Sequence, residues 1–130
     1  MLLVRTRLAT SKIHGIGLFA EEFIAQGMIT WKYLEGFDLR LRQSAIDELS
    51  ESAKLQTLKY AYFDEQLGLY ELCSDDARFF NHADDPNTRS LALPSGEEVD
   101  VAIRDIRAGE ELTCDYRAFD RDWKFKLGRS

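Results

Sequence analysis

Three short stretches of the chain combine residue types that could carry chemistry. In His14-Gly15-Ile16-Gly17, two glycines flank one residue, so the backbone could approach a ligand closely. In the segment 76–87, Asn81 and His82 stand side by side and offer an amide and an imidazole to a polar ligand. In the segment 109–116, Tyr116 follows an apolar strand with a hydroxyl that can donate and accept. Taken singly, each stretch is only a weak signal for a ligand-binding site.

Each stretch also has a simpler interpretation. The glycines could line an ordinary turn, and they do not match a dinucleotide-binding fingerprint, which needs a third glycine and a following helix. Tyr116 could be a core residue whose hydroxyl finds a partner. The segment 76–87 could be a loop in which Asn and Asp cap their own backbone. Alternatively, His82, Asp84 and Asp85 could hold a divalent cation, because imidazole and carboxylate are common ligands.

Short strands and one helix are the elements expected to position these residues. Apolar, β-branched and aromatic residues predict strands over 2–8, 18–20, 28–33, 61–64, 69–73, 90–93 and 99–103. The turn signal Pro94-Ser95-Gly96-Glu97 predicts a hairpin between the last two. Ser44 as N-cap, with acidic residues in the following turn, predicts one helix over 45–59. The fold class is therefore mostly β, with one inserted helix.

A weak internal repeat relates residues 23–29 to residues 105–112. Both read as an apolar residue, a short turn closed by glycine, and then a new strand. The glycines Gly27 and Gly109 would supply a positive φ that other residues adopt only at a cost. The pattern is equally explained by two unrelated turns that share turn chemistry.

Length and charge limit the class of protein and its partners. The 130 residues fit one domain, 1–130. With 17 Lys+Arg against 23 Asp+Glu, the net charge of −6 disfavours duplex nucleic acid and suits a basic partner. No apolar run approaches the roughly 20 residues of a membrane span, and no signal peptide is recognisable. Two cysteines cannot form a disulfide scaffold, so we expect a reducing compartment, cytoplasmic or, in a eukaryote, nuclear.

The order of the three stretches resembles the SET-domain protein-lysine N-methyltransferases. The chain shows H-G-x-G, then R-F-x-N-H-x-x-x-P-N, then G-E-E-L-x-x-D-Y, spread over residues 14–116. The resemblance implies a β-clip of small curled sheets, in which the C-terminal segment crosses an earlier loop as a pseudoknot. No cysteine-rich zinc module flanks these stretches in the sequence, so the chain resembles compact stand-alone members of prokaryotic or viral type.

The resemblance also implies the reaction and the residue roles. Methyl transfer from S-adenosylmethionine to a lysine amine would use Tyr116 as the catalytic tyrosine. Asn81 would hold the amino-acid end of the cofactor, and the His82 backbone would contact the adenine. Arg78 would meet the cofactor carboxylate or pair with Asp115. The further implied cofactor-binding residues are Gly15, Ile16, Gly17 and Phe119, and those of the substrate channel are Tyr33, Phe80, Tyr116 and Phe119.

The implied substrate is a lysine-containing basic protein or peptide. The acidic stretch 64–85 could steer it, although a solvated acidic face is the simpler interpretation. The tail 117–130, or a second subunit in a homodimer, would close the channel. Two alternatives stay open: a SET-like binding module without turnover, and a metal-binding β-domain.

Overall fold

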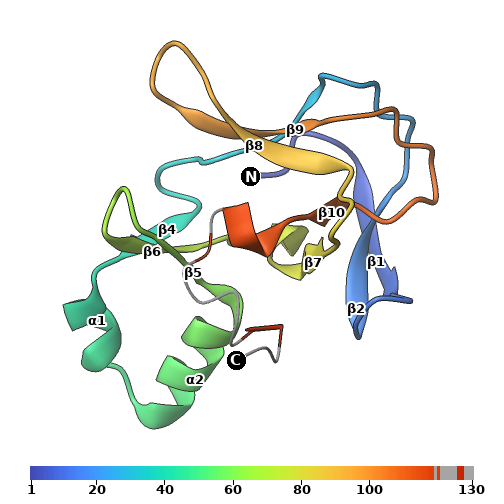
Figure 1. The fold of residues 1–130 in the computed structure, drawn as a ribbon. Coiled ribbons are helices and arrows are strands. Elements are labelled where there is room, and N and C mark those ends of the chain that lie inside the picture. Colours follow the sequence, from blue (N-terminus) through green and yellow to red (C-terminus); the bar gives the residue numbers. More distant parts are fainter. Residues whose placement is uncertain (119, 121–125, 128–130) are drawn as a thin grey trace.

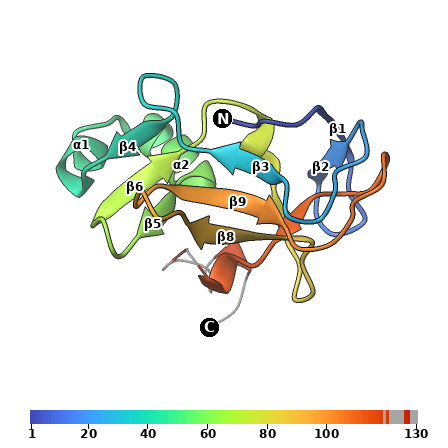
Figure 2. The ribbon, with the colours of Figure 1, turned by 90° about the horizontal axis from the view of Figure 1, so that it is seen from above.

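Four small β-sheets contain most of the regular secondary structure in the computed structural model, which describes residues 1–118, 120, 126 and 127 (Figure 1). β1 (Thr6–Thr10) pairs with β2 (Ile16–Ala20). A second sheet has the order β3 (Ile29–Lys32), β9 (Glu98–Ala102), β8 (Thr88–Ala92), which Figure 2 shows side by side. A third has the order β4 (Leu39–Leu41), β6 (Leu69–Leu72), β5 (Tyr62–Asp64). The fourth contains β7 (Asn81–His82) and β10 (Thr113–Cys114).

The mostly β fold class is confirmed, and so is the hairpin around Pro94–Glu97, where β8 and β9 pair antiparallel. Each strand expected from apolar and β-branched residues overlaps one in the structure. No residue pattern predicted β4, β7 or β10. The last two are only two residues long, and they form through partners distant in sequence rather than through their own propensity.

The single helix predicted over 45–59 is wrong, because two helices stand in its place. α1 (Gln43–Asp47) ends at Glu48, and α2 (Glu51–Tyr60) begins after Ser50. The Ser50 side chain accepts a hydrogen bond from the Ala53 backbone N–H at 3.2 Å. That cap starts a new helix inside the predicted one. Ser44 lies within α1 and is no N-cap.

The repeat is visible in three dimensions and extends well beyond the two turns. β1–β2 pairs Thr6 with Ala20, and β8–β9 pairs Thr88 with Ala102, so both partners shift by 82 positions (88 − 6 and 102 − 20). The hairpin loops are equally long: Ser11 N–H donates to the Gly15 carbonyl, and Leu93 N–H to the Glu97 carbonyl, both at 2.8 Å. Two hairpins of the same register therefore occur in one chain.

The two repeated turns bind each other. The backbones of Ile24 and Ile106 exchange two hydrogen bonds of 2.8 Å, and both side chains are fully buried. Gly27 and Gly109 have φ of +88° and +91°, as the turn pattern predicts. Gly27 N–H donates to the carbonyl of Ala102, and Gly109 N–H to that of Ala20. Each turn thus closes on the end of a hairpin.

A crossing of two distant segments lies at the centre of the molecule, where β7 and β10 run parallel (Figure 1). Asn87 ties β10 down from the other side. Its Nδ2 donates to the Glu111 carbonyl and its Oδ1 accepts from Thr113 N–H, both at 2.8 Å. The Thr88 hydroxyl donates to the Thr113 carbonyl at 2.7 Å. The segment 111–114 is therefore held between β7 and residues 87–88, as the pseudoknot expectation requires.

The main apolar core packs beneath this crossing. It includes Leu18, Ile24, Ile106 and Leu112, all fully buried, together with Trp31 and Phe80. A smaller cluster around Ile46 and Tyr70 fixes the helices to the third sheet. Among the described residues, no helix has the length and apolar character needed to cross a membrane.

Candidate active site

Tyr116 is fixed where the crossing ends. Its hydroxyl donates to the Phe80 carbonyl at 2.5 Å, and its backbone N–H donates to His82 Nδ1 at 3.1 Å. Since Nδ1 accepts, a neutral His82 carries its proton on Nε2, which lies 2.8 Å from Asp84 Oδ1. The structure thus brings Tyr116 together with Phe80, Asn81 and His82, although more than 30 positions separate them in sequence.

Asn81 lies at the centre of a group of hydrogen-bond acceptors. Its Nδ2 is 2.9 Å from Glu111 Oε2, 3.1 Å from the His14 carbonyl, 3.2 Å from Ser11 Oγ and 3.3 Å from the Ile16 carbonyl. An amide nitrogen has two hydrogens, so four acceptors exceed what it can satisfy. We call Ser11, His14, Ile16, Asn81 and Glu111 the acceptor cluster. Its surplus of acceptors and its carboxylate suit a ligand with an ammonium group.

Gly17 allows the acceptor cluster to close. A Cβ placed on Gly17 would lie 2.3 Å from Glu111 Oε2 and 3.0 Å from the Ser11 Cβ. The missing side chain therefore lets the Glu111 carboxylate approach the backbone of β2. Ile16 is 52% exposed and leaves one side of this region open to solvent.

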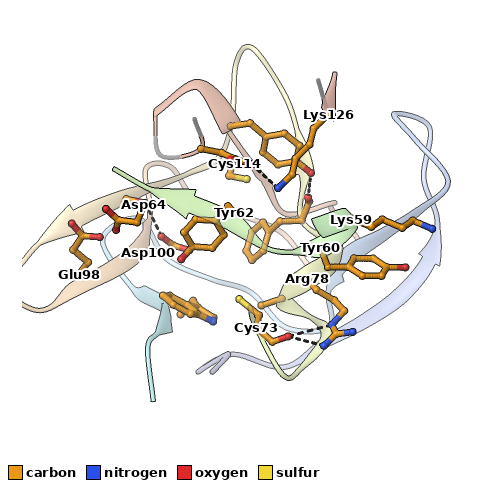
Figure 3. A pocket seen from close by; sticks show the side chains of 16 residues that line it. Lys59, Tyr60, Tyr62, Asp64, Cys73, Arg78, Glu98, Asp100, Cys114 and Lys126 are labelled. Carbon is orange, nitrogen blue, oxygen red and sulfur yellow. Dashed lines mark hydrogen bonds and ion pairs between the residues drawn. The ribbon is translucent and has the colours of Figure 1, made fainter. Parts of the chain in front are cut away.

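A cavity of about 110 Å³ lies next to the Tyr116 ring (Figure 3). Aromatic residues form much of its wall: Trp31, Tyr60, Tyr62, Phe80 and Tyr116. Lys126 and Asp120 also line it, and their side chains form an ion pair of 2.6 Å. A cavity whose wall combines five aromatic side chains with charged groups suits an aliphatic side chain that ends in an amine.

Burial controls the charge state of the groups around this cavity. It raises the pKa of the Tyr116 hydroxyl, and the carboxylates of Asp120 and Glu111 act in the same direction, so this phenol is neutral at ordinary pH. Burial also raises the pKa of the thiols of Cys73 and Cys114, which are both free. Burial raises the pKa of Asp100 to about 7, although the Ser90 hydroxyl lowers it. The Tyr116 phenol and both thiols are therefore protonated at ordinary pH.

The predicted residues do not all reach this cavity. Arg78 lines it, but its guanidinium donates to the Cys73 carbonyl at 2.9 Å and 3.2 Å and lies 5.2 Å from the Tyr60 ring. Arg78 does not pair with Asp115, which binds Arg117 instead. Tyr33 lies elsewhere, with its hydroxyl donating to the Asp38 carbonyl at 3.2 Å. Phe119 lies outside the described residues.

The geometry of the described residues does not support a metal site at His82, Asp84 and Asp85. Within residues 1–118, 120, 126 and 127, no group of three His, Cys, Asp or Glu side chains is arranged to hold an ion. Asp85 is fully exposed, with Arg104 at 4.0 Å. The His82 imidazole is engaged on both sides, by the Tyr116 N–H and by Asp84.

Several residues of the site were missed from sequence. Ser11 and Glu111 complete the acceptor cluster, and Tyr62, Asp100 and Lys126 line the cavity. Glu111 could have been identified from the sequence, because it belongs to the G-E-E-L stretch on which the resemblance rests. The others lie in no recognisable pattern, since only the folded chain brings them to the site.

Comparison with known families gives a match to the SET domain over residues 15–117. A histone-lysine N-methyltransferase of Dictyostelium discoideum, set1, is 31% identical over 120 residues. That alignment covers 87% of this chain and 8% of the relative. A histone-lysine N-methyltransferase of Aspergillus oryzae, H3 lysine-4 specific, is 33% identical over 128 residues, covering 90% of this chain. The chain spans about a tenth of the length of these curated relatives.

Among solved structures, ctPRC2 in an autoinhibited conformation bound to S-adenosylmethionine superposes with a TM-score of 0.63. The sequences are 25% identical, and the match covers 96% of this chain and 16% of that chain. Because the match covers nearly the whole chain, the two proteins share this fold.

Proposed function

Because the chain belongs to the SET-domain family, we propose that it transfers a methyl group from S-adenosylmethionine to the side-chain amine of a lysine in a basic protein. The observation that carries this proposal is the placement of Tyr116. Tyr116 lines the cavity, and its hydroxyl donates to the carbonyl of Phe80, the residue before Asn81 of the acceptor cluster. One crossing thereby joins a site for an ammonium-bearing ligand to a site for an amine.

The acceptor cluster fits the amino-acid end of the cofactor. The carbonyls of His14 and Ile16 and the carboxylate of Glu111 would accept from its ammonium group. Asn81 would hold these acceptors in place and could turn its own oxygen toward the ligand. When bound, S-adenosylmethionine supplies a methyl group on a positively charged sulfur.

The cavity would prepare the lysine amine. A free lysine has a pKa of about 10.4, so keeping it neutral near pH 7 costs roughly 4–5 kcal/mol. The aromatic wall removes water, which disfavours the ammonium form. The Tyr116 hydroxyl donates to the Phe80 carbonyl, so its oxygen lone pairs are directed elsewhere and can accept from the amine. These residues would act by orientation and by excluding water.

The relatives named as histone-lysine N-methyltransferases support a basic protein as substrate. The net charge of −6 supports the same class. We propose that the substrate is a histone or a similarly basic protein. The chain would then act in the compartment that contains this substrate. In the proposed enzyme, the tail 117–130 or a second subunit of a homodimer would close the substrate channel.

The test is to incubate the purified protein with methyl-labelled S-adenosylmethionine and a mixture of basic proteins. We expect label on lysine side chains, located by mass spectrometry. Glu48→Gln, an exposed substitution at the end of α1, is the matched control and should retain full transfer. Cofactor binding without any transfer would contradict the enzyme proposal and favour a non-catalytic SET-like module.

A further inference from the structure

A lysine of the chain itself places its amine in the cavity that Tyr116 lines. The Lys126 side chain is 16% exposed, and Figure 3 shows it pointing into the cavity. Lys32 and Lys54, by contrast, pair with glutamates at the surface, and their side chains are 45% and 28% exposed. A lysine is rarely buried unless its ammonium group has a partner. The cavity therefore already holds the kind of side chain that the proposed substrate would bring.

Two acceptors bind the ammonium group of Lys126. Its Nζ lies 2.6 Å from Asp120 Oδ2 and donates to the Ala61 carbonyl at 2.5 Å. The Asp120 side chain is 1% exposed, so water reaches this ion pair only from the side of the lysine. Taking an ammonium group out of water is costly, and only close, well-placed partners offset that cost. This part of the cavity is therefore a site fitted to an ammonium group.

The ammonium site is close to the tyrosine of the proposed reaction. The Asp120 backbone N–H donates to the Tyr116 carbonyl at 2.9 Å. Burial is the main cause of the raised pKa of the Tyr116 hydroxyl, and the Asp120 carboxylate adds to it, so this charge acts on the phenol. Two ammonium groups at one carboxylate would repel each other. The Lys126 amine and a substrate lysine beside Tyr116 therefore exclude each other.

We propose that Lys126 is an internal competitor of the substrate: its amine occupies the part of the cavity that receives the target lysine, and the target lysine binds by displacing it. This inference rests on the proposed function, which assigns the cavity to a lysine side chain. Lysine has a flexible four-carbon stem, so Lys126 can leave by rotation about its own bonds. Only a lysine carried by a segment with further contacts to the protein would displace it, so the competitor raises selectivity.

Peptide binding in the absence of any cofactor tests the competition. The probes are short, N-acetylated peptides of arginine and alanine with one central lysine, and matched peptides carry norleucine, which keeps the stem and lacks the amine. In fluorescence anisotropy, Lys126→Gln should bind the lysine peptides about tenfold more tightly than wild type, because the site is no longer filled. The norleucine peptides should bind both proteins equally. Lys126→Arg keeps a cation for Asp120 and should keep the wild-type affinity.

Lys54→Gln is the matched control, because it removes the same charge from an ion pair outside the cavity. It should bind both kinds of peptide as wild type does. Glutamine at position 126 can still donate to the Ala61 carbonyl, and an unchanged Tm would confirm that this variant retains the fold. Equal affinities of wild type and Lys126→Gln for the lysine peptides, or a gain that the norleucine peptides share, would overturn the inference.

Acetylation by an N-hydroxysuccinimide ester, read by mass spectrometry, follows Lys126 directly. In the free protein Lys126 should react slowly, because its amine is buried and paired. A peptide with dimethyllysine, which the ester does not modify, should expose Lys126 to the reagent once it saturates the protein. Protection that persists at saturation would overturn the inference. Displacement of Lys126 without methyl transfer from labelled S-adenosylmethionine to the lysine peptides would contradict the proposed function alone.

Discussion

The two repeated hairpins share a backbone and differ in what their side chains do. Leu18 in β2 and Asp100 in β9 correspond to each other, because the two hairpins are related by a shift of 82 positions. Leu18 is fully buried in the core, whereas Asp100 lines the cavity. In the loops, Ser11 hydrogen-bonds Glu111, and its counterpart Leu93 has no polar side chain. The first hairpin faces the acceptor cluster and the second faces the cavity.

A hairpin that occurs twice in one chain can therefore form two chemically different sides of one site. The two repeated turns join the hairpins through backbone hydrogen bonds that both repeats provide, such as those of Ile24 and Ile106. A few substitutions in the inner strands and loops then give each side its own chemistry. The comparison predicts that changes around the first hairpin alter cofactor binding, and that changes around the second alter substrate use.

The largest effect is expected at Tyr116, between the two sides. Tyr116→Phe removes the hydroxyl that donates to Phe80 and faces the cavity. Methyl transfer should fall about a hundredfold or more, because a positioned polar group at the reacting atoms is lost. Calorimetry should give a cofactor affinity within a few-fold of wild type. An unchanged rate of methyl transfer would show that the Tyr116 hydroxyl takes no part in the reaction.

Asn87→Ala tests the crossing that holds the hairpins together. Asn87 is 2% exposed, and its removal leaves the Glu111 carbonyl and the Thr113 N–H unpaired. The free energy of unfolding in urea should fall by about 2 kcal/mol. A loss of cofactor affinity without any loss of stability would show instead that Asn87 acts on the ligand.

Glu111→Gln and Glu97→Gln separate the two sides with the same chemical change. Glu111 lies in the acceptor cluster, and Glu97 follows the second loop in an exposed ion pair with Lys32 at 3.0 Å. Losing the charge of Glu111 should weaken cofactor binding about tenfold, measured by calorimetry. Glu97→Gln should leave it unchanged, since exposed ion pairs contribute little. Equal losses of cofactor affinity in the two variants would contradict the assignment of cofactor binding to the side of the first hairpin.

Asp100 gives the second hairpin a pH dependence that Leu18 cannot give the first. Its pKa is raised from 3.8 to about 7, so the folded protein holds this proton more tightly than the unfolded chain. That stabilisation is complete below about pH 4 and is lost as the pH rises through about 7. Glu71 and Glu98 face the same carboxylate and keep its pKa high.

Raising the pH from about 5 to about 8 should therefore lower the Tm of the wild type a few degrees more than that of Asp100→Asn. Differential scanning calorimetry at the two pH values measures this. Parallel Tm curves for the two proteins would mean that Asp100 is already ionised at the lower pH.

The smallest effect compares a serine in each loop. The Ser11 hydroxyl donates to Glu111 at 2.7 Å, and Ser95 only accepts from the Glu97 N–H at 3.4 Å. Ser11→Ala should weaken cofactor binding a few-fold, because Glu111 loses the Ser11 hydroxyl and keeps the hydrogen bond from Asn81 at 2.9 Å. Ser95→Ala should match wild type in the same titration.

The sequence predicted the parts of the site that depend on local pattern. Asn81, His82 and Tyr116 stand in long stretches with fixed offsets, and the turns at Gly27 and Gly109 depend on local backbone chemistry. The cavity residues Trp31, Asp64 and Asp100 could not be predicted, because only the pairing of distant strands brings them together. The break between α1 and α2 was missed because the same residues also suit a continuous helix, and the Ser50 cap decided between them.

Under the proposed function, one crossing places an ammonium-binding cluster and an amine-binding cavity on its two sides. A crystal structure with S-adenosylhomocysteine and a methyllysine peptide tests it most directly. We predict the ligand's ammonium group on the carbonyls of His14 and Ile16 and the carboxylate of Glu111, and the methyllysine nitrogen in the cavity beside the Tyr116 hydroxyl. A cofactor bound away from Asn81, or a lysine in another groove, would contradict it.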